Sequence, residues 1–283
     1  MTIRTALEQG SELLGRDGIA NPRLTAEVLL GHAIHCERAY FYAHPEQELR
    51  EVEWIHYGRY LDERLKGKPT QYITKRQEFY GREFRISRDV LIPRSETEHL
   101  VEAILKLNRA PGTIVDVGTG SGIIAITLAL ELGRPVIATD LSFEACAIAR
   151  DNAVRLGANV QFLVADLLKP FADASIDIVV SNPPYVPLSD RAMLQREVRD
   201  YEPSLALYGG PNGIEIYKRL IPEARRVLKP EGILAFEFGF SQVDAITELA
   251  SAFPNREIIP DLAGIPRVLV CTTGGLAAGS FSS

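Results

Sequence analysis

The sequence Ser181-Asn182-Pro183-Pro184-Tyr185 directly follows an apolar run at 176–180. The run is rich in β-branched residues, which predicts a buried strand. Two consecutive prolines exclude both helix and central ladder pairing, so the chain after the strand is predicted to be extended and exposed. An amide, two rigid backbone carbonyls and an aromatic ring would then be presented together at the end of a strand.

These groups suit the transfer of a methyl group to an amide or aryl-amine nitrogen. Such a nitrogen is a poor nucleophile because its lone pair is delocalised, and it can lose a proton after the attack. It therefore needs orientation more than a strong base. The side-chain oxygen of Asn182 and the carbonyl of Pro183 can accept its two N–H groups, while Tyr185 can pack on a planar substrate. The alternative is an Asn-Pro-Pro turn that only ends the strand.

A second group of residues predicts a nucleoside site. Gly118, Gly120 and Gly122 follow an apolar strand and let a ligand approach the backbone closely. Asp140 ends the next predicted strand, where a carboxylate can accept both hydroxyls of a ribose. Asp166 ends the third, where it can accept from an adenine amine. The glycine spacing favours S-adenosylmethionine over NAD. Alternatively, each acid could simply cap the following helix.

The elements that must position these groups alternate between strand and helix from residue 112 on. Strands are predicted near 113–117, 135–139, 160–164, 176–181, 232–238, 256–259 and 266–271, and helices near 122–132, 142–156, 213–228 and 241–252. This alternation predicts an open, mostly parallel sheet with helices on both faces. Only the short stretch "PDLAGIP" joins the last two strands, so we expect them to be antiparallel neighbours.

Residues 1–70 are predicted to form a helical domain that recognises the substrate. Trp54, Tyr57, Leu61 and Leu65 share one face of a helix predicted near 46–66. We interpret this stripe as core packing, and a protein-docking face is the alternative.

The segment 71–92 is predicted to be a linker that contains a hairpin about a Tyr80-Gly81 turn. The α/β domain is expected at 93–272. Near its start, Ser95 and Glu98 have the spacing of a capping box. Residues 273–283 have the composition of a flexible tail.

Composition and charge restrict the class of protein. Of the 283 residues 46% are hydrophobic and 24% charged, and the net charge is −6. Residues 1–85 carry 13 basic and 13 acidic residues, and the remainder carries 18 and 24, so neither part shows the basic excess of a phosphate-gripping surface. No apolar run approaches the ~20 residues of a membrane span, and no secretory signal is visible. Three isolated cysteines predict neither a disulfide framework nor a metal site and favour a cytoplasmic protein.

Several segments resemble one family. The stretches "DVGTGSG", "ATDLSFEACAIARDNA" and "VVSNPPY" are similar to class I S-adenosylmethionine-dependent methyltransferases that modify amino groups. Four others, "LIPRSETEHLV", "YEPSLALYGGPNGIEIYKRLIPEA", "EFGFSQ" and "DLAGIPRVLV", are similar to the PrmC/HemK family. Its members methylate the side-chain amide (N5) of the glutamine in the Gly-Gly-Gln loop of bacterial class 1 peptide chain release factors. The resemblance covers all but the final dozen residues.

The resemblance implies a Rossmann-like, seven-stranded methyltransferase sheet, mostly parallel with an antiparallel last strand. It implies S-adenosyl-L-methionine as cofactor and S-adenosyl-L-homocysteine as product. The residues implied to contact the cofactor are Gly118, Thr119, Gly120, Ser121, Gly122, Asp140, Asp166, Leu167 and Asn182. Those implied to hold the substrate glutamine are Asn182, Pro183, Pro184 and Tyr185, with Asn182, Pro183 and Tyr185 taking the catalytic part. The family usually has proline in place of Ser95, and some relatives have an aromatic residue in place of Leu167.

We expect a monomer that acts on a release factor, without a membrane and without stable binding to nucleic acid. The main alternative is methylation of an adenine or another nucleic-acid amine, because the same Asn-Pro-Pro-Tyr motif serves that chemistry. A protein that binds the cofactor or a partner without turnover, and an NAD oxidoreductase, are two further alternatives. The segment 186–210 is expected to be either a mobile cover or a packed excursion.

Overall fold

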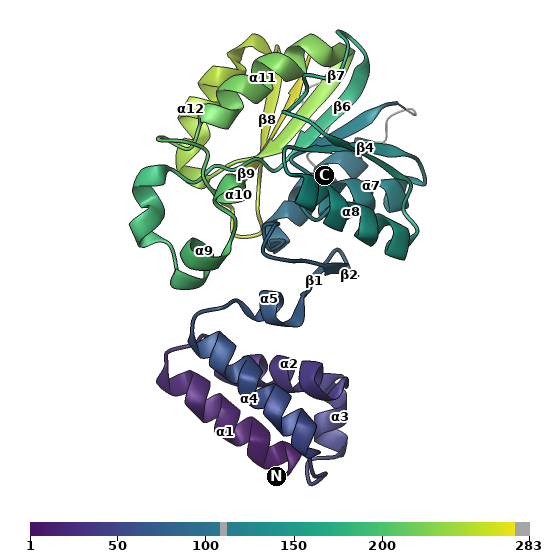
Figure 1. The fold of residues 1–283 in the computed structure, drawn as a ribbon. Helices are drawn as coiled ribbons and strands as arrows, with labels where there is room; N and C mark the ends of the chain where they lie inside the picture. The colour runs from purple at the N-terminus through teal and green to yellow at the C-terminus, as the bar shows by residue number, and fades with distance from the viewer. Residues whose placement is uncertain (108–111, 275–283) are drawn as a thin grey trace. The chain divides into compact units, whose positions relative to one another are not determined.

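A computed structural model describes residues 1–107 and 112–274 of the chain. The chain divides into two compact units, which we call the helical unit and the sheet unit (Figure 1). The helical unit is Met1–Arg76 together with Gln195–Tyr201, and the sheet unit is formed by Gln77–Leu194 and Glu202–Ser283. From residue 275 on, the predicted flexible tail lies outside the described residues.

The helical unit packs its helices around one apolar core. Its N-terminal helices are α1 (Ile3–Arg16), α2 (Pro22–Ile34), α3 (Arg38–Ala43), α4 (Glu51–Leu65) and α5 (Thr70–Thr74). Tyr57 and Leu61 on α4 are buried in this core, and Trp54 and Leu65 are partly buried against it. The interpretation of the α4 stripe as core packing is therefore confirmed.

The helical unit also includes a short helix from far along the chain, α9 (Arg196–Tyr201). Nη2 of Arg64 lies 2.5 Å from Oε2 of Glu197, and the Arg64 side chain is only 10% exposed. The hydroxyl of Tyr201 donates to the carbonyl of Lys66 at 3.1 Å. This part of segment 186–210 is thus a packed excursion of the chain.

A hairpin begins the sheet unit, as predicted. Strands β1 (Arg76–Phe79) and β2 (Arg82–Arg85) form a two-stranded sheet. Tyr80 and Gly81 between them have φ values of 51° and 67°, the left-handed backbone that two-residue hairpin turns favour.

The predicted capping box is wrong. A 3₁₀ turn, η1 (Ser95–Thr97), comes first, and the helix α6 (Glu98–Lys106) begins only after it. The hydroxyl of Ser95 donates to the side chain of Glu96 instead of capping the helix. Oε1 of Glu98 accepts the backbone N–H of Tyr80 at 2.8 Å. A tertiary hydrogen bond to the hairpin has replaced the local one.

The main sheet has seven strands in the order β5-β4-β3-β6-β7-β9-β8. They are β3 (Ile114–Val117), β4 (Val136–Asp140), β5 (Val160–Val164), β6 (Ile176–Ser181), β7 (Leu228–Glu237), β8 (Asn255–Pro260) and β9 (Pro266–Thr272). The first five in this order pair in parallel, and β9 runs antiparallel to β7 and to β8. The predicted fold, with its antiparallel last strand, is confirmed. The strand β7 begins four residues before its predicted start.

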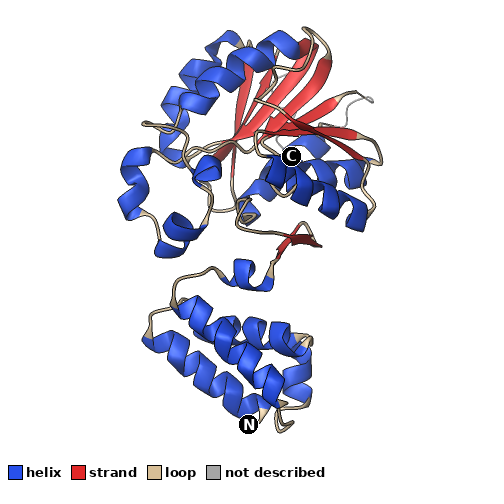
Figure 2. Cartoon of the chain, in the orientation of Figure 1, coloured by secondary structure: helices blue, strands red, loops and turns tan. Residues whose placement is uncertain are grey.

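Helices cover both faces of this sheet (Figures 1 and 2). One face packs against α6, α7 (Ile123–Leu132) and α8 (Phe143–Leu156), and the other against α11 (Glu215–Val227) and α12 (Val243–Leu249). The shorter helices are η2 (Leu188–Met193), α10 (Ser204–Leu207), η3 (Phe240–Gln242) and η4 (Ala250–Ala252). Within the described ranges no helix has the length and apolarity needed to cross a membrane.

Asn152 on α8 connects three parts of the sheet unit. Its side-chain Nδ2 donates to the carbonyls of Arg85 and Ser121 at 2.9 and 3.0 Å, and its Oδ1 accepts the N–H of Arg85 at 2.8 Å. The residue is fully buried. It therefore ties the hairpin to the glycine-containing loop after β3.

We predict that Asn152→Ala lowers the free energy of unfolding by about 1–3 kcal/mol, because buried polar groups lose their partners. The exposed Asn159 offers a matched control, and Asn159→Ala should change it by less than about 0.5 kcal/mol. Urea denaturation followed by circular dichroism measures both. Equal values for the two variants would contradict the structural role of Asn152.

Candidate active site

The register of three parallel strands brings the predicted site residues to one edge of the sheet. Val117 at the end of β3 pairs with Thr139 on β4 and with Ser181 on β6. The next residues along the three segments, Gly118, Asp140 and Asn182, therefore lie side by side at this edge. A cavity of about 330 Å³ lies at this edge.

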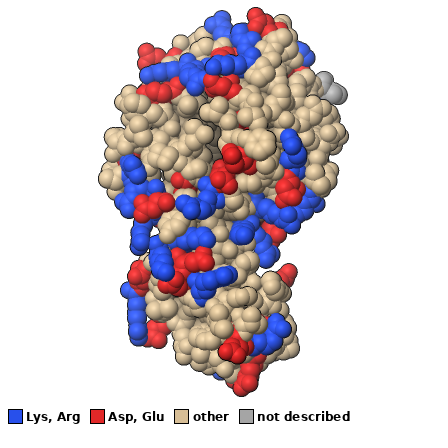
Figure 3. All heavy atoms as spheres, viewed as in Figure 1, with Lys and Arg blue, Asp and Glu red and all other residues tan. Residues whose placement is uncertain are grey.

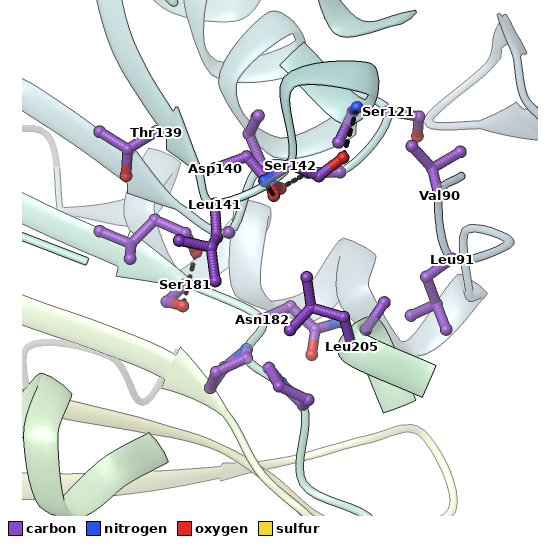
Figure 4. Close-up of a pocket in the computed structure, with 18 of the residues that line it drawn as sticks. Val90, Leu91, Ser121, Thr139, Asp140, Leu141, Ser142, Ser181, Asn182 and Leu205 are labelled. Atoms are coloured by element: carbon purple, nitrogen blue, oxygen red, sulfur yellow. Dashed lines mark hydrogen bonds between the residues drawn. The ribbon is translucent and has the colours of Figure 1, made fainter. Parts of the chain in front are cut away.

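Most of the sequence-predicted residues line this cavity. They are Gly118, Thr119, Gly120, Ser121, Asp140, Asp166, Leu167, Asn182, Pro183 and Pro184. Asp140 and Ser121 lie across the cavity from Asn182 and Leu205 (Figure 4). The other two predicted residues, Gly122 and Tyr185, are not among the lining residues in the part of the chain that the structure describes.

The glycine loop after β3 presents bare backbone to the cavity. Gly118 and Gly120 have positive φ values of 73° and 56°, and a Cβ at either position would meet no atom within 4 Å. The N–H groups of Gly118 and Thr119 both donate to the carbonyl of Thr139, at 2.8 and 2.9 Å. The loop is thus held against β4 while its glycines leave room for a ligand.

A buried carboxyl group holds this loop in place through hydrogen bonds. Oδ2 of Asp116 accepts the hydroxyl of Thr119 at 2.6 Å and the N–H of Ala125 at 3.2 Å. Burial raises the pKa of Asp116 to about 7. Asp116 was not among the site residues predicted from the sequence, although an acid inside an apolar strand is a visible signal.

Asp140 also stabilises the glycine loop. Its Oδ2 accepts the N–H of Gly120 and its Oδ1 accepts the N–H of Ser142, each at 2.9 Å. Burial raises the pKa of the Asp140 carboxyl. Each carboxylate oxygen has a second lone pair, so both can still accept a hydroxyl from the cavity.

Asp166, which also lines the cavity, lies among cations. It accepts from Lys169 at 2.5 Å and from Nη2 of Arg219 at 2.6 Å. Hydrogen bonds from Lys169 and then from Arg219 lower the pKa of Asp166. Arg219 lines the cavity too, but the sequence argument missed it because it comes from α11, 53 residues away in the sequence.

Asn182 is held by a hydrogen-bond chain that the sequence argument also missed. Its Nδ2 donates to Oγ1 of Thr97 at 2.9 Å, and the hydroxyl of Thr97 donates to Oε2 of Glu237 at 2.7 Å. Thr97 and Glu237 are buried, and burial raises the pKa of Glu237 to about 7. Both residues belong to segments that carry the family resemblance, "LIPRSETEHLV" and "EFGFSQ", but neither was predicted to belong to the site.

Tyr185 packs against the hydrophobic cluster between the sheet and α11. Its backbone carbonyl accepts Nε2 of Gln242 at 2.9 Å. Burial raises the pKa of Tyr185 to about 12, so its hydroxyl remains protonated at neutral pH and is no general base.

An ion pair between a partly exposed arginine and a buried glutamate forms another wall of the cavity. Oε1 of Glu202 lies 2.5 Å from Nη2 of Arg94, and Oε2 of Glu202 accepts the N–H of Ile92 at 3.2 Å. Arg94 lines the cavity, as do Pro203 and Leu205, which follow Glu202. This wall combines segments more than 100 residues apart. Across residues 1–107 and 112–274, no cluster of three or more His, Cys, Asp or Glu side chains has the geometry of a metal site.

Known families match both parts of the chain. Residues 5–74 match the model of the PrmC N-terminal domain, and residues 95–199 match that of the methyltransferase small domain. A release factor glutamine methyltransferase of Koribacter versatilis is 46% identical to the chain, over 95% of this chain and 98% of that protein. The chain belongs to the release factor glutamine methyltransferase family. Another member, from Moorella thermoacetica, is 42% identical over 94% of this chain and 97% of its own.

A solved structure supports the fold. A methyltransferase from Pyrococcus furiosus matches with a TM-score of 0.52 at 20% identity, over 69% of this chain and 91% of that chain. At this identity the match concerns the fold alone.

Gly122 is the loop glycine with the least room. Its φ is +87°, and a Cβ there would lie 2.7 Å from Cδ1 of Ile126 and 3.1 Å from Cβ of Ala149. Gly157 has a similar φ of +73° with no atom within 4 Å of a Cβ.

We predict that Gly157→Ala costs about 1–2 kcal/mol of stability through backbone strain. Gly122→Ala should cost about 1–3 kcal/mol more, because the added methyl group also overpacks the contact with α8. Thermal unfolding of both variants measures the difference, and equal losses would contradict the close packing.

Proposed function

We propose that the protein transfers a methyl group from S-adenosyl-L-methionine to the side-chain amide nitrogen (N5) of the glutamine in the Gly-Gly-Gln loop of class 1 peptide chain release factors. The observation that carries this proposal is the position of Asn182 in the same cavity as Asp140 and the glycine loop. The names of the relatives agree with it.

The cavity fits the proposed cofactor. Asp140 has lone pairs left for the ribose hydroxyls, and the open space above Gly118 and Gly120 lets the cofactor lie against backbone. Asp166 and Leu167 would border the adenine. When bound, S-adenosyl-L-methionine supplies an electrophilic methyl group on a sulfonium centre.

The chain's own part in the reaction is to orient the substrate amide. Asn182 Oδ1 and the carbonyl of Pro183 accept the two N–H groups of the glutamine, which directs the nitrogen lone pair at the methyl group. Tyr185, which packs in the hydrophobic cluster and does not line the cavity in the described residues, contributes to the position of the Asn-Pro-Pro turn and not to the contact with the substrate amide. The amide loses its proton to water after the attack, so the site needs no strong base.

The charge distribution favours a protein substrate over nucleic acid. The net charge is −6, and basic and acidic side chains are interspersed on the face shown in Figure 3. Proteins that grip many phosphates present a continuous basic surface instead. In this proposal the enzyme acts as a monomer in the cytoplasm, where its three free cysteines stay reduced.

Methyl transfer from labelled S-adenosyl-L-methionine tests the proposal. The acceptors are a purified release factor, its variant with alanine in place of the Gly-Gly-Gln glutamine, and a mixture of tRNA and DNA. Label on the unmodified release factor alone is expected. Label on the nucleic acid alone would assign the site to nucleic-acid amines, and label on the alanine variant would move the target to another residue.

Two substitutions should separate catalysis from cofactor binding. Asn182→Ala is expected to lower kcat by about 100- to 1000-fold, since the substrate amide loses its orienting acceptor. The dissociation constant of S-adenosyl-L-homocysteine should stay within about 3-fold. Asp140→Ala should weaken that binding by about 10-fold or more, because the ribose loses a charged acceptor and the glycine loop loses its anchor. Calorimetry and single-turnover assays measure the two effects, and comparable changes in both quantities for both variants would contradict this division of roles.

A further inference from the structure

The carboxamide of Asn182 has two different ends. Its Oδ1 is a hydrogen-bond acceptor, whereas its Nδ2 is a donor of two hydrogens. A substrate amide nitrogen presents N–H groups, so only Oδ1 can bind it productively. A rotation of the carboxamide by 180° would oppose donor to donor and turn the substrate away. Something must therefore fix which end faces the cavity.

Thr97 and Glu237 fix it through the direction of their hydrogen bonds. An ionised Glu237 can only accept, so the single hydrogen of the Thr97 hydroxyl points to Oε2 of Glu237, 2.7 Å away. The lone pairs of Thr97 Oγ1 then accept Nδ2 of Asn182 at 2.9 Å. Thr97 is fully buried and Glu237 is 2% exposed, which shields the chain of hydrogen bonds from bulk water.

We propose that Thr97 and Glu237 are positioning residues that hold the Asn182 carboxamide with Oδ1 toward the substrate, so that the site selects a nitrogen that carries N–H groups. This inference rests on the proposed function and names two of its specificity determinants. It also explains why a threonine before α6 and a glutamate at the end of β7 lie together, although 140 residues separate them in the sequence.

We call the chain of hydrogen bonds from Asn182 through Thr97 to Glu237 the relay. The charge of Glu237 decides the direction of its hydrogen bonds. The hydrogen-bonding, titratable and charged groups that face Glu237 come from several packed elements. They are Thr97, Arg94 and Glu96 before α6, Arg267 on β9, Tyr185 after β6, and Tyr217 on α11. The hydroxyl of Tyr217 donates to the backbone carbonyl of Glu237 at 2.8 Å. Burial outweighs the hydrogen bond from Thr97 and the two arginines, and it raises the pKa of Glu237 to about 7.

The sign of the pH effect follows from this raised pKa. Above pH 7 Glu237 is a carboxylate and the relay points as described. Below pH 7 the carboxyl is protonated and can donate to Thr97 Oγ1, which frees the Thr97 hydrogen for Oδ1 of Asn182. The carboxamide then no longer has a fixed direction. We therefore expect kcat to fall as the pH drops through about 7, while cofactor binding changes little.

Kinetics of methyl transfer to a release factor test the relay in the full-length protein. T97V keeps the shape of the side chain but removes the hydroxyl, and it should lower kcat by about 10- to 100-fold. T97S restores the hydroxyl and should recover kcat to within about 3-fold of the wild type. E237Q should abolish the fall in kcat near pH 7, because the titrating group is gone. The exposed Glu248 on α12 provides the control, and E248Q should keep the wild-type pH profile. A wild-type kcat for T97V, or an unchanged pH profile for E237Q, would overturn the inference.

A second measurement needs no substrate and separates this inference from the proposed function. In protein with ¹⁵N-labelled asparagine, the side-chain NH₂ resonance of Asn182 can be identified by its loss in N182S. It should titrate near pH 7 in the wild type and in E248Q, and not in E237Q or T97V. A missing titration in the wild type would overturn the relay even if the release factor is methylated. A normal titration without methylation of the release factor would support the relay and overturn the proposed substrate.

Discussion

The site depends on the parallel pairing of β3 with both of its neighbours. Val117 is level with Thr139 on one side and with Ser181 on the other, so the chain leaves all three strands at one height. A slip of one residue in either pairing would turn every side chain of that strand to the opposite face. The apolar residues of β3 and β6 are buried on both faces, which makes such a slip costly. The packing of the sheet therefore fixes where the glycine loop and Asn182 meet.

Around this edge, polar groups are arranged so that backbone and carboxylates support each other. Asp116 and Asp140 each accept a backbone N–H from the loop or helix that follows β3, although burial disfavours their charged forms. In another wall of the cavity, the buried carboxylate of Glu202 likewise has fixed partners. It forms an ion pair with Arg94 and accepts the backbone N–H of Ile92. Buried acids with fixed partners keep such walls rigid, and rigid walls preserve the orientation on which amide methylation relies.

The segment between the Asn-Pro-Pro-Tyr motif and α11 belongs to both units. It leaves the sheet unit after Leu194, packs as α9 in the helical unit through Glu197 and Tyr201, and re-enters the sheet unit at Glu202, next to residues that line the cavity. Glu202, which pairs with Arg94 in one wall of the cavity, thus follows α9 directly along the chain.

The sequence alone determined the strands of the main sheet and the residues at the ends of β3, β4 and β6, whereas the short helices within 186–210 were not predicted. Apolar runs, glycines and prolines act over a few residues, so six of the seven strands lie within one residue of their predicted limits. Local spacing failed where a distant partner competed, as at Ser95 and Glu98, where a bond to the hairpin replaced the capping box. Only the tertiary structure decided that Thr97 and Glu237 would support Asn182. Their hydrogen bonds join residues about 85 and 140 positions apart in the sequence, and such contacts form only when the strands have paired and the chain has folded.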